Sequence, residues 1–266
     1  MLRNAFLSCV LALVLALAAG CASVPPPAAV TELAPGGTMR AAINLGNPIL
    51  ASKDKASGEL RGVSVDLARE LARRLGVAVE LVEYTAAGRV VEGVKTRSWD
   101  IAFVAIDPAR AVDIAYSPPY VVIEGAYLVR NESPIRSNAE VDRPGTRVVV
   151  GRASAYDLYL TRELKQATIV RAPTSPAVVD QFVAEKLEVA AGVRQQLELD
   201  AKRVPGLRML PGRFMVINQA MGTPRERAAG AAYLRDFIEE MKASGFVADA
   251  LSRHRIEGAG VAPPGH

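Results

Sequence analysis

From residue 39 onward the chain alternates short apolar runs with amphipathic stretches. Leucines recur every four residues from Leu67 to Leu75 between charged positions, which predicts a helix with one apolar face, and Gly76 follows as at a helix C-terminus. Apolar or alternating runs on either side predict strands. We expect these strands over residues 39–44, 77–84 and 99–106, with a second helix over 86–96.

The same alternation repeats in the second half of the chain. We expect strands over residues 147–150, 168–171, 187–191 and 207–210, and helices over 154–166, 175–186 and 194–202. Two successive units of alternating strands and helices predict an α/β fold with two open, mostly parallel sheets and helices on both faces.

Helix starts and the C-terminal region are predicted from capping patterns. Ser64 is expected to cap the first helix, and the segment Thr223–Glu226 has the capping-box pattern ahead of an apolar helical stretch. Residues 257–266 are rich in Gly and Pro and are expected to form a flexible tail.

The first residues have the features of an export signal. A basic start at Arg3 precedes an apolar run that ends in small residues before Cys21, so we expect a signal peptide over residues 1–20. The segment before Cys21 resembles a bacterial lipobox, which implies lipidation of Cys21. An ordinary signal peptide cut nearby is the alternative. Residues 21–37, rich in Pro and Ala, are expected to form a lipid-anchored linker.

Composition excludes several classes of function. The net charge is only +4, the basic residues are scattered and aromatic residues make up 5% of the chain, so we expect no nucleic-acid partner. His254 and His266 are the two histidines of the chain, and both lie near its C-terminus. Metal or triad chemistry is therefore not expected, and no cofactor is expected because no glycine-rich phosphate loop is present.

Five segments in order resemble the bacterial extracellular solute-binding proteins of family 3, the amino-acid-binding components of ABC importers. These segments are Gly58–Ala68, Trp99–Ala102, Asp107–Arg110, Tyr116–Tyr120 and Gly151–Tyr156. The resemblance implies a type II periplasmic-binding-protein-like fold with two open α/β lobes joined by a two-strand hinge. Lobe 1 is then expected over residues 38–129 and 219–256, and lobe 2 over 130–218.

Candidate ligand contacts lie at the carboxyl ends of the predicted strands. Arg110 follows one such strand by a tight turn, and arginine can bind a carboxylate through two parallel hydrogen bonds. The resemblance also implies that Arg110 holds the carboxylate of a ligand. Ser154 and Ala155 open a helix whose N-terminal end favours anions, although Ser154 could act only as a helix cap.

Other positions depart from the family pattern. Asn47 aligns with an aromatic residue that stacks on ligand, Ala105 with a serine of the cleft, and Val193 with the acidic residue that binds the ammonium group of the ligand. Either another acid supplies that charge, with Glu124 as the best candidate, or the ligand lacks an α-amino group. Gln219 interrupts an apolar stretch and is a further candidate for ligand contact.

These observations predict the substrate-binding protein of an ABC importer that captures a small carboxylate-bearing solute, such as an amino acid. The expected partners are the small-molecule ligand, a permease in the inner membrane and the membrane itself through the lipid anchor, with the protein a periplasmic monomer. Two alternatives remain: an enzyme on the same fold, similar to cyclohexadienyl or arogenate dehydratases, and a ligand-sensing ectodomain partner.

Overall fold

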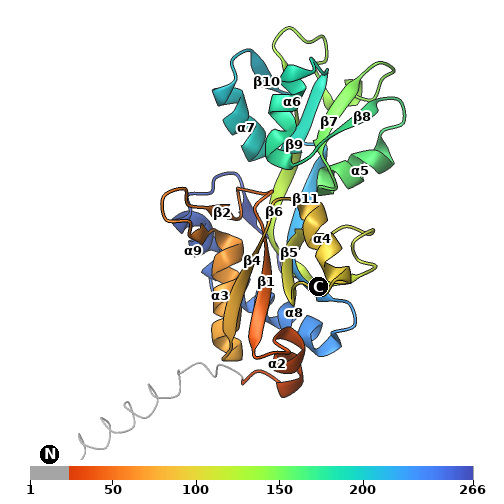
Figure 1. Ribbon diagram of the computed structural model, residues 1–266. Coiled ribbons are helices and arrows are strands. Elements are labelled where there is room, and N and C mark those ends of the chain that lie inside the picture. The colour runs from red at the N-terminus through yellow and green to blue at the C-terminus, as the bar shows by residue number, and fades with distance from the viewer. Residues whose placement is uncertain (1–23, 266) are drawn as a thin grey trace, which may run out of the picture.

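The computed structural model describes residues 24–265, which form two α/β lobes, one above the other in Figure 1. The predicted signal peptide over residues 1–20 and the predicted lipidation site at Cys21 lie outside the described residues. None of the described helices combines the length and the apolar character that a membrane crossing requires.

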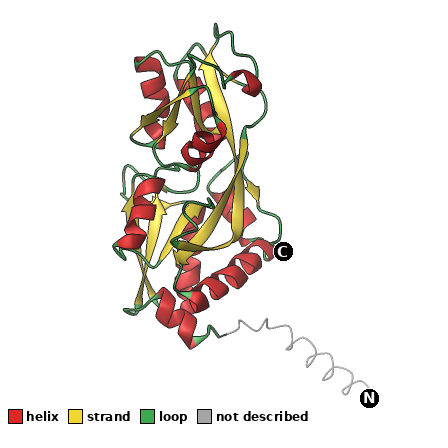
Figure 2. Cartoon of the chain, turned by 90° about the vertical axis from the view of Figure 1, so that its right-hand side faces the viewer, coloured by secondary structure: helices red, strands yellow, loops and turns green. Residues whose placement is uncertain are grey.

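A single ten-stranded sheet runs through both lobes in the order β4-β1-β5-β11-β6-β9-β7-β8, with β10 and β12 paired to β6. This differs from the two separate sheets that the repeated pattern predicted, because β6 (Ile114–Arg130) is long enough to pair with strands of both lobes. Figure 2 shows long strands that pass from one lobe to the other, and β6 and β11 (Met215–Pro224) make this connection. The other strands are β1 (Thr38–Asn44), β2 (Ser52–Lys53), β3 (Leu60–Arg61), β4 (Ala78–Tyr84), β5 (Ile101–Ala105), β7 (Arg147–Gly151), β8 (Thr168–Ala172), β9 (Val189–Val193), β10 (Leu207–Met209) and β12 (Gly260–Val261).

Helices cover both faces of the sheet in the first lobe. Successive residues of a strand point to opposite faces, so Ala41 of β1 joins the core that includes α3 and α8, whereas Ala42 joins the smaller core that includes α4. The predicted Leu67–Leu75 stripe is buried in the larger core. The helices of this lobe are α2 (Pro27–Leu33), α3 (Val63–Leu75), α4 (Ala87–Lys95), α8 (Ala228–Ala243) and α9 (Phe246–Arg253).

The second lobe repeats this arrangement. Val149 of β7 faces the core formed with α6 and α7, whereas Val148 and Val150 pack on the side of α5. Its helices are α5 (Ala155–Glu163), α6 (Val178–Ala184) and α7 (Arg194–Arg203), with short 3-10 turns η2 (Asn138–Glu140) and η3 (Ser175–Ala177). The predicted α/β class with helices on both faces is therefore confirmed.

Two segments that we expected to be irregular are ordered. Within the predicted linker, α2 buries Ala29 and Leu33, and the Glu32 carboxylate accepts a hydrogen bond from the backbone of Gly230 at 2.7 Å. Within the predicted tail, β12 pairs with β6 and the next residue, Ala262, is 3% exposed. Both predictions fail because a few well-spaced apolar residues dock on the first lobe, which a composition rich in Pro, Ala and Gly conceals.

Two predicted helix caps have other roles. The N-cap of α3 is Gly62, at φ +127°, and the Ser64 hydroxyl instead lies 3.0 Å from the Tyr120 hydroxyl. Thr223 belongs to the end of β11, and its hydroxyl donates to the Asp100 carbonyl at 2.9 Å, while α8 begins only at Ala228. In both cases a distant partner in the core uses the hydroxyl that the local pattern assigns to a cap.

Candidate functional site

A small cavity of about 30 Å³ lies between the lobes, at the carboxyl ends of the parallel strands. The structure brings seven of the eight predicted ligand-binding residues together around it, from both lobes and from β11. These residues are Asn47, Ala105, Arg110, Ser154, Ala155, Val193 and Gln219. Open α/β sheets place ligands at this edge, because the loops that follow the strands converge there.

Arg110 is the charged residue among those that line the cavity. Its Nη1 donates to the Ala105 carbonyl at 2.9 Å, and its Nη2 donates across the cleft to the Ala153 carbonyl at 2.8 Å. Its Nε is buried and has no partner among the described residues. Burial lowers the pKa of Arg110, although a guanidinium stays protonated in proteins. The cavity therefore contains a buried positive charge whose described hydrogen-bond partners are neutral carbonyls.

No nearby titratable group among the described residues forms a direct ion pair with that charge, although the field of Asp107 opposes the effect of burial on the pKa of Arg110. The Asp107 carboxylate lies beside Arg110 in sequence, but it accepts from Arg162 Nη2 at 2.9 Å and from the Ala109 amide at 2.8 Å. Tyr116 donates weakly to the Ala105 carbonyl at 3.4 Å. Burial raises the pKa of Tyr116 to about 12, so this phenol is neutral at physiological pH.

Ser154 acts as the N-cap of α5. Its hydroxyl oxygen accepts from the Asp157 amide at 3.0 Å, while the Asp157 carboxylate accepts from the Ala153 amide at 2.7 Å. The helix cap that the sequence left as an alternative is thus present. The Ser154 hydroxyl is also a hydrogen-bond partner of the buried Tyr156 phenol, and the positive end of α5 faces the cavity through Ala155.

Asn47 and Gln219 supply amide groups to the lining of the cavity. The Asn47 Oδ1 is buried and has no partner among the described residues, and Gln219 is 7% exposed on β11. Its neighbour Asn218 is exposed on the other face of that strand, as expected from the alternation of side chains. The cavity thus presents an unpartnered donor, Arg110 Nε, and an unpartnered acceptor, Asn47 Oδ1.

Glu124 was predicted to hold the ammonium group of a ligand, and the structure contradicts this placement. Its carboxylate accepts from Arg213 Nη1 and from Arg194 Nε, each at 2.7 Å, and Glu124 does not line the cavity. The hydrogen bonds from Arg213 and Arg194 lower the pKa of Glu124. Glu124 is therefore part of an ion-pair network beside the crossover strands.

Sequence reasoning missed several lining residues, among them Asn44, Tyr156 and Ser175. Asn44 ends β1 and Ser175 follows β8, so the rule that selected Arg110 would have found both. A Cβ on Gly151 would lie 2.6 Å from the Ser175 Oγ and 2.8 Å from the Tyr156 hydroxyl oxygen. Gly151 is thus needed for these two side chains to meet at the end of β7.

The lobes are in contact around the cavity. In addition to the Arg110–Ala153 hydrogen bond, Asp107 of the first lobe and Arg162 of the second form an ion pair at 2.9 Å. A Cβ on Gly88 would lie only 2.7 Å from the Ala153 Cβ, and Ala153 itself has φ +55°. The structure therefore has the two lobes closed on each other.

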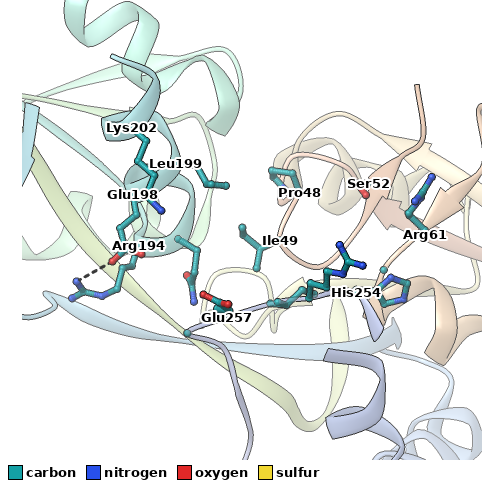
Figure 3. Close-up of a pocket in the computed structure, with 15 residues that line it drawn as sticks. Pro48, Ile49, Ser52, Arg61, Arg194, Glu198, Leu199, Lys202, His254 and Glu257 are labelled. Carbon is teal, nitrogen blue, oxygen red and sulfur yellow. Dashed lines mark ion pairs between the residues drawn. The ribbon is translucent and has the colours of Figure 1, made fainter. Parts of the chain in front are cut away.

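A second and much larger hollow, of about 520 Å³, lies between α7 and the loop that follows β1 (Figure 3). We call it the outer cleft. Its charged side chains largely pair with one another or with neighbours: Arg194 with Glu124, and His254 with Asp66 at 2.9 Å. Across the described residues, no cluster of three or more His, Cys, Asp or Glu could hold a metal ion. The outer cleft is the larger of the two hollows. The Arg110 cavity is nevertheless the better candidate for ligand binding, because it contains a buried charge without an ionic partner among the described residues.

Comparison with known proteins gives one family and many similar folds. The family model described as bacterial extracellular solute-binding proteins, family 3, matches residues 39–254. A solute receptor for L-cysteine of Neisseria gonorrhoeae superposes with a TM-score of 0.75 at 21% identity, covering 86% of this chain and 94% of that one. The P235GK mutant of ArgBP from T. maritima gives a TM-score of 0.74 at 20% identity, covering 86% of this chain and 100% of that one. A putative binding component of an ABC transporter from Wolinella succinogenes DSM 1740, complexed with lysine, gives 0.71 at 22% identity, covering 82% and 95%.

Proposed function

Because the chain belongs to the bacterial extracellular solute-binding proteins of family 3, with the type II periplasmic binding fold, we propose that it captures a small carboxylate-bearing solute between its lobes. The single observation that carries the proposal is the buried guanidinium of Arg110, whose Nε has no partner among the described residues. An amino acid or a related carboxylate is the expected class of ligand, in line with the lysine and L-cysteine named for similar structures.

The chemistry of Arg110 favours a carboxylate. A buried charge without a counter-charge is strongly unfavourable, so a ligand that brings a negative charge gains more free energy here than in water. The planar guanidinium can also donate two parallel hydrogen bonds to a carboxylate, which fixes the orientation of the ligand. Arg110 Nη2 donates to the Ala153 carbonyl of the second lobe, so Arg110 itself connects the two lobes at the proposed site.

Lobe closure suits capture and release. Two strands, β6 and β11, connect the lobes, and hinge closure around a ligand is a common transition in such folds. We further propose that the protein works in the periplasm as a monomer, anchored through a lipid on Cys21, and delivers its ligand to an ABC permease in the inner membrane. The sequence of the first 21 residues supports the export and anchoring steps.

We favour binding over catalysis for one reason. A dehydratase needs a group that can act as general acid, and the described residues that line the Arg110 cavity include no carboxyl group and no histidine. The tyrosine among them, Tyr156, has its pKa raised by burial. Turnover of prephenate or arogenate, followed by absorbance, would contradict this preference.

Titration calorimetry with a panel of amino acids and other small carboxylates tests the proposal. We expect at least one ligand to bind, and Arg110→Ala to weaken it at least about 30-fold, since removing one partner of a buried charge pair costs about 2–5 kcal/mol. Lys202→Ala, which removes a positive charge from the outer cleft, is the matched control and should change affinity less than about twofold. A folded protein that binds no member of the panel, or an Arg110→Ala variant that binds as tightly as the parent, would contradict the proposal.

A further inference from the structure

We infer that the ligand is a small carboxylate without an α-ammonium group, such as a 2-hydroxy acid, rather than an amino acid. This inference rests on the proposed function and narrows its substrate class. It follows from the charges around the Arg110 cavity, which include a cation but no carboxylate among the described residues that line it.

The acidic residues described beside the cavity are each paired with an arginine. Asp107 lies beside Arg110, Asp157 beside Tyr156, and Asp200 lines the next hollow together with Asn47 and Val193. The pairs are Asp107 with Arg162 at 2.9 Å, Asp157 with Arg171 at 3.0 Å, Asp200 with Arg203 at 2.9 Å, and Glu124 with Arg194 and Arg213, both at 2.7 Å. The charge of each of these acids is therefore already balanced by an arginine, and none of them lines the cavity itself.

Helix ends add to the positive potential. The N-terminal ends of α5 and α7 both face the cavity, through Ser154 and Ala155 in one case and Val193 in the other. A helix N-terminus carries a partial positive charge, which favours anions and disfavours cations. Together with Arg110, these two ends make the site favourable for a net negative ligand and unfavourable for the ammonium half of a zwitterion.

An ammonium group would therefore be buried near like charge and without a counter-ion, which is a costly arrangement. A hydroxyl group avoids this cost. The buried Asn47 Oδ1 has no partner among the described residues and can accept one hydrogen bond from a hydroxyl, a neutral donor. The two unpartnered atoms of the cavity thus match a carboxylate at Arg110 Nε and a hydroxyl at Asn47.

Matched ligands that share a carbon skeleton test the inference. We would titrate the protein with L-alanine, (S)-lactate and pyruvate, and with L-aspartate, L-malate and succinate, by calorimetry at pH 7. In at least one set, the 2-hydroxy acid should bind at least about tenfold tighter than the amino acid, and also tighter than pyruvate or succinate, which cannot donate to Asn47 Oδ1. Equal or tighter binding of the amino acid in the sets that bind overturns the inference but leaves the proposed function standing. If neither these sets nor the wider panel binds, the proposed function fails and the inference fails with it.

A charge introduced at Val193 gives a second test. Val193 is the N-cap of α7, a position where Asp and Asn are both favoured, so neither substitution should prevent folding. Val193→Asp should shift the preference toward the amino acid by at least about tenfold, whereas the uncharged Val193→Asn should shift it by less than about threefold. A preference that is the same in both variants as in the parent would overturn the role given to the missing carboxylate. Asn47→Asp, which places a carboxylate on the opposite wall, repeats the test independently.

Discussion

The Arg110 cavity and the outer cleft both lie between the lobes, yet they differ in size and in how their charges are satisfied. The outer cleft is larger, about 520 Å³ against about 30 Å³, and several of its charged residues have ionic partners, such as Arg194 with Glu124. The Arg110 cavity has a single guanidinium, 3% exposed, bonded only to carbonyl oxygens.

This difference is the reason for proposing the smaller cavity as the binding site. Exposed ion pairs in a wide cleft are largely screened and contribute little free energy, so a ligand gains little by replacing them. A buried charge without a counter-charge, in contrast, gives a large gain to any ligand of opposite charge that reaches it. Closed lobes account for the small volume of the proposed site, because the protein itself fills most of the space that an open form would expose.

Gly88 offers the sharpest further test of this contrast, because it lies beside the Arg110 cavity and not in the outer cleft. A side chain there would meet Ala153 of the other lobe, with the two Cβ atoms only 2.7 Å apart. Gly88→Leu should therefore hinder closure and weaken ligand binding at least about tenfold, while leucine at this helical position should leave stability unchanged or higher. Calorimetry and thermal unfolding measure the two effects separately.

The matched control for Gly88 is Arg89→Leu on the same helix. Arg89 is exposed and pairs with Glu92, so the substitution adds the same side chain away from the second lobe. Its affinity should equal that of the parent. Small-angle scattering with ligand should show a more open Gly88→Leu protein, and an equally compact complex of normal affinity would mean that lobe contact at Ala153 is not needed for binding.

Much of the fold could be predicted from the sequence because its signals are local. The leucine stripe from Leu67 to Leu75 and the strand-to-turn position of Arg110 both depend on residues within about ten positions of one another. Glu124 could not be assigned in this way, because Arg194 and Arg213 lie 70 and 89 positions further along the chain. Its apolar neighbours indicated burial, but only the folded arrangement shows which partners reach it.

The same reason explains the other errors. The hydroxyls of Ser64 and Thr223 match a helix cap locally, yet each bonds a group far away in the sequence. Helix α2 has a composition typical of a linker, and its order depends on docking against α8. Sequence patterns thus predict elements and strand ends well, while long-range partners decide what each polar side chain does.

Glu124 provides a test with a smaller effect. Its folded-state pKa is lowered by the arginines, so its stabilising contribution is present above its ordinary pKa of 4.5 and is lost as the pH falls through the folded-state value. At pH 7, Glu124→Gln should lower the free energy of unfolding by no more than about 1 kcal/mol, because the pair is partly exposed and screened. The difference from the parent should shrink below pH 4.5 and disappear in stronger acid.

Ligand affinity of Glu124→Gln at pH 7 should equal that of the parent, because the carboxylate lies outside the cavity. Chemical denaturation over a pH series gives the stability, and calorimetry gives the affinity. Glu198→Gln, which removes a carboxylate 3.8 Å from the same Arg194, is the control and should lower the free energy of unfolding at pH 7 by less than Glu124→Gln does. A large loss of affinity in Glu124→Gln alone would return Glu124 to the list of ligand contacts.

The smallest expected effect concerns Gln195, which lines the outer cleft. Like Arg110 in its cavity, it has buried polar atoms without a hydrogen-bond partner among the described residues. Both amide atoms of Gln195 are buried without a partner among the described residues, and the side chain packs against Gly258 of the C-terminal segment. An amide is neutral, so leaving it unpaired costs far less than leaving a charge unpaired. Gln195→Met keeps the length of the side chain and removes the unsatisfied groups, so the free energy of unfolding should be unchanged or higher by no more than about 0.5 kcal/mol.

Ligand affinity of Gln195→Met should equal that of the parent. If affinity falls instead, the ligand reaches into the outer cleft, and unpartnered amides would have to be counted with unpartnered charges as marks of the binding site.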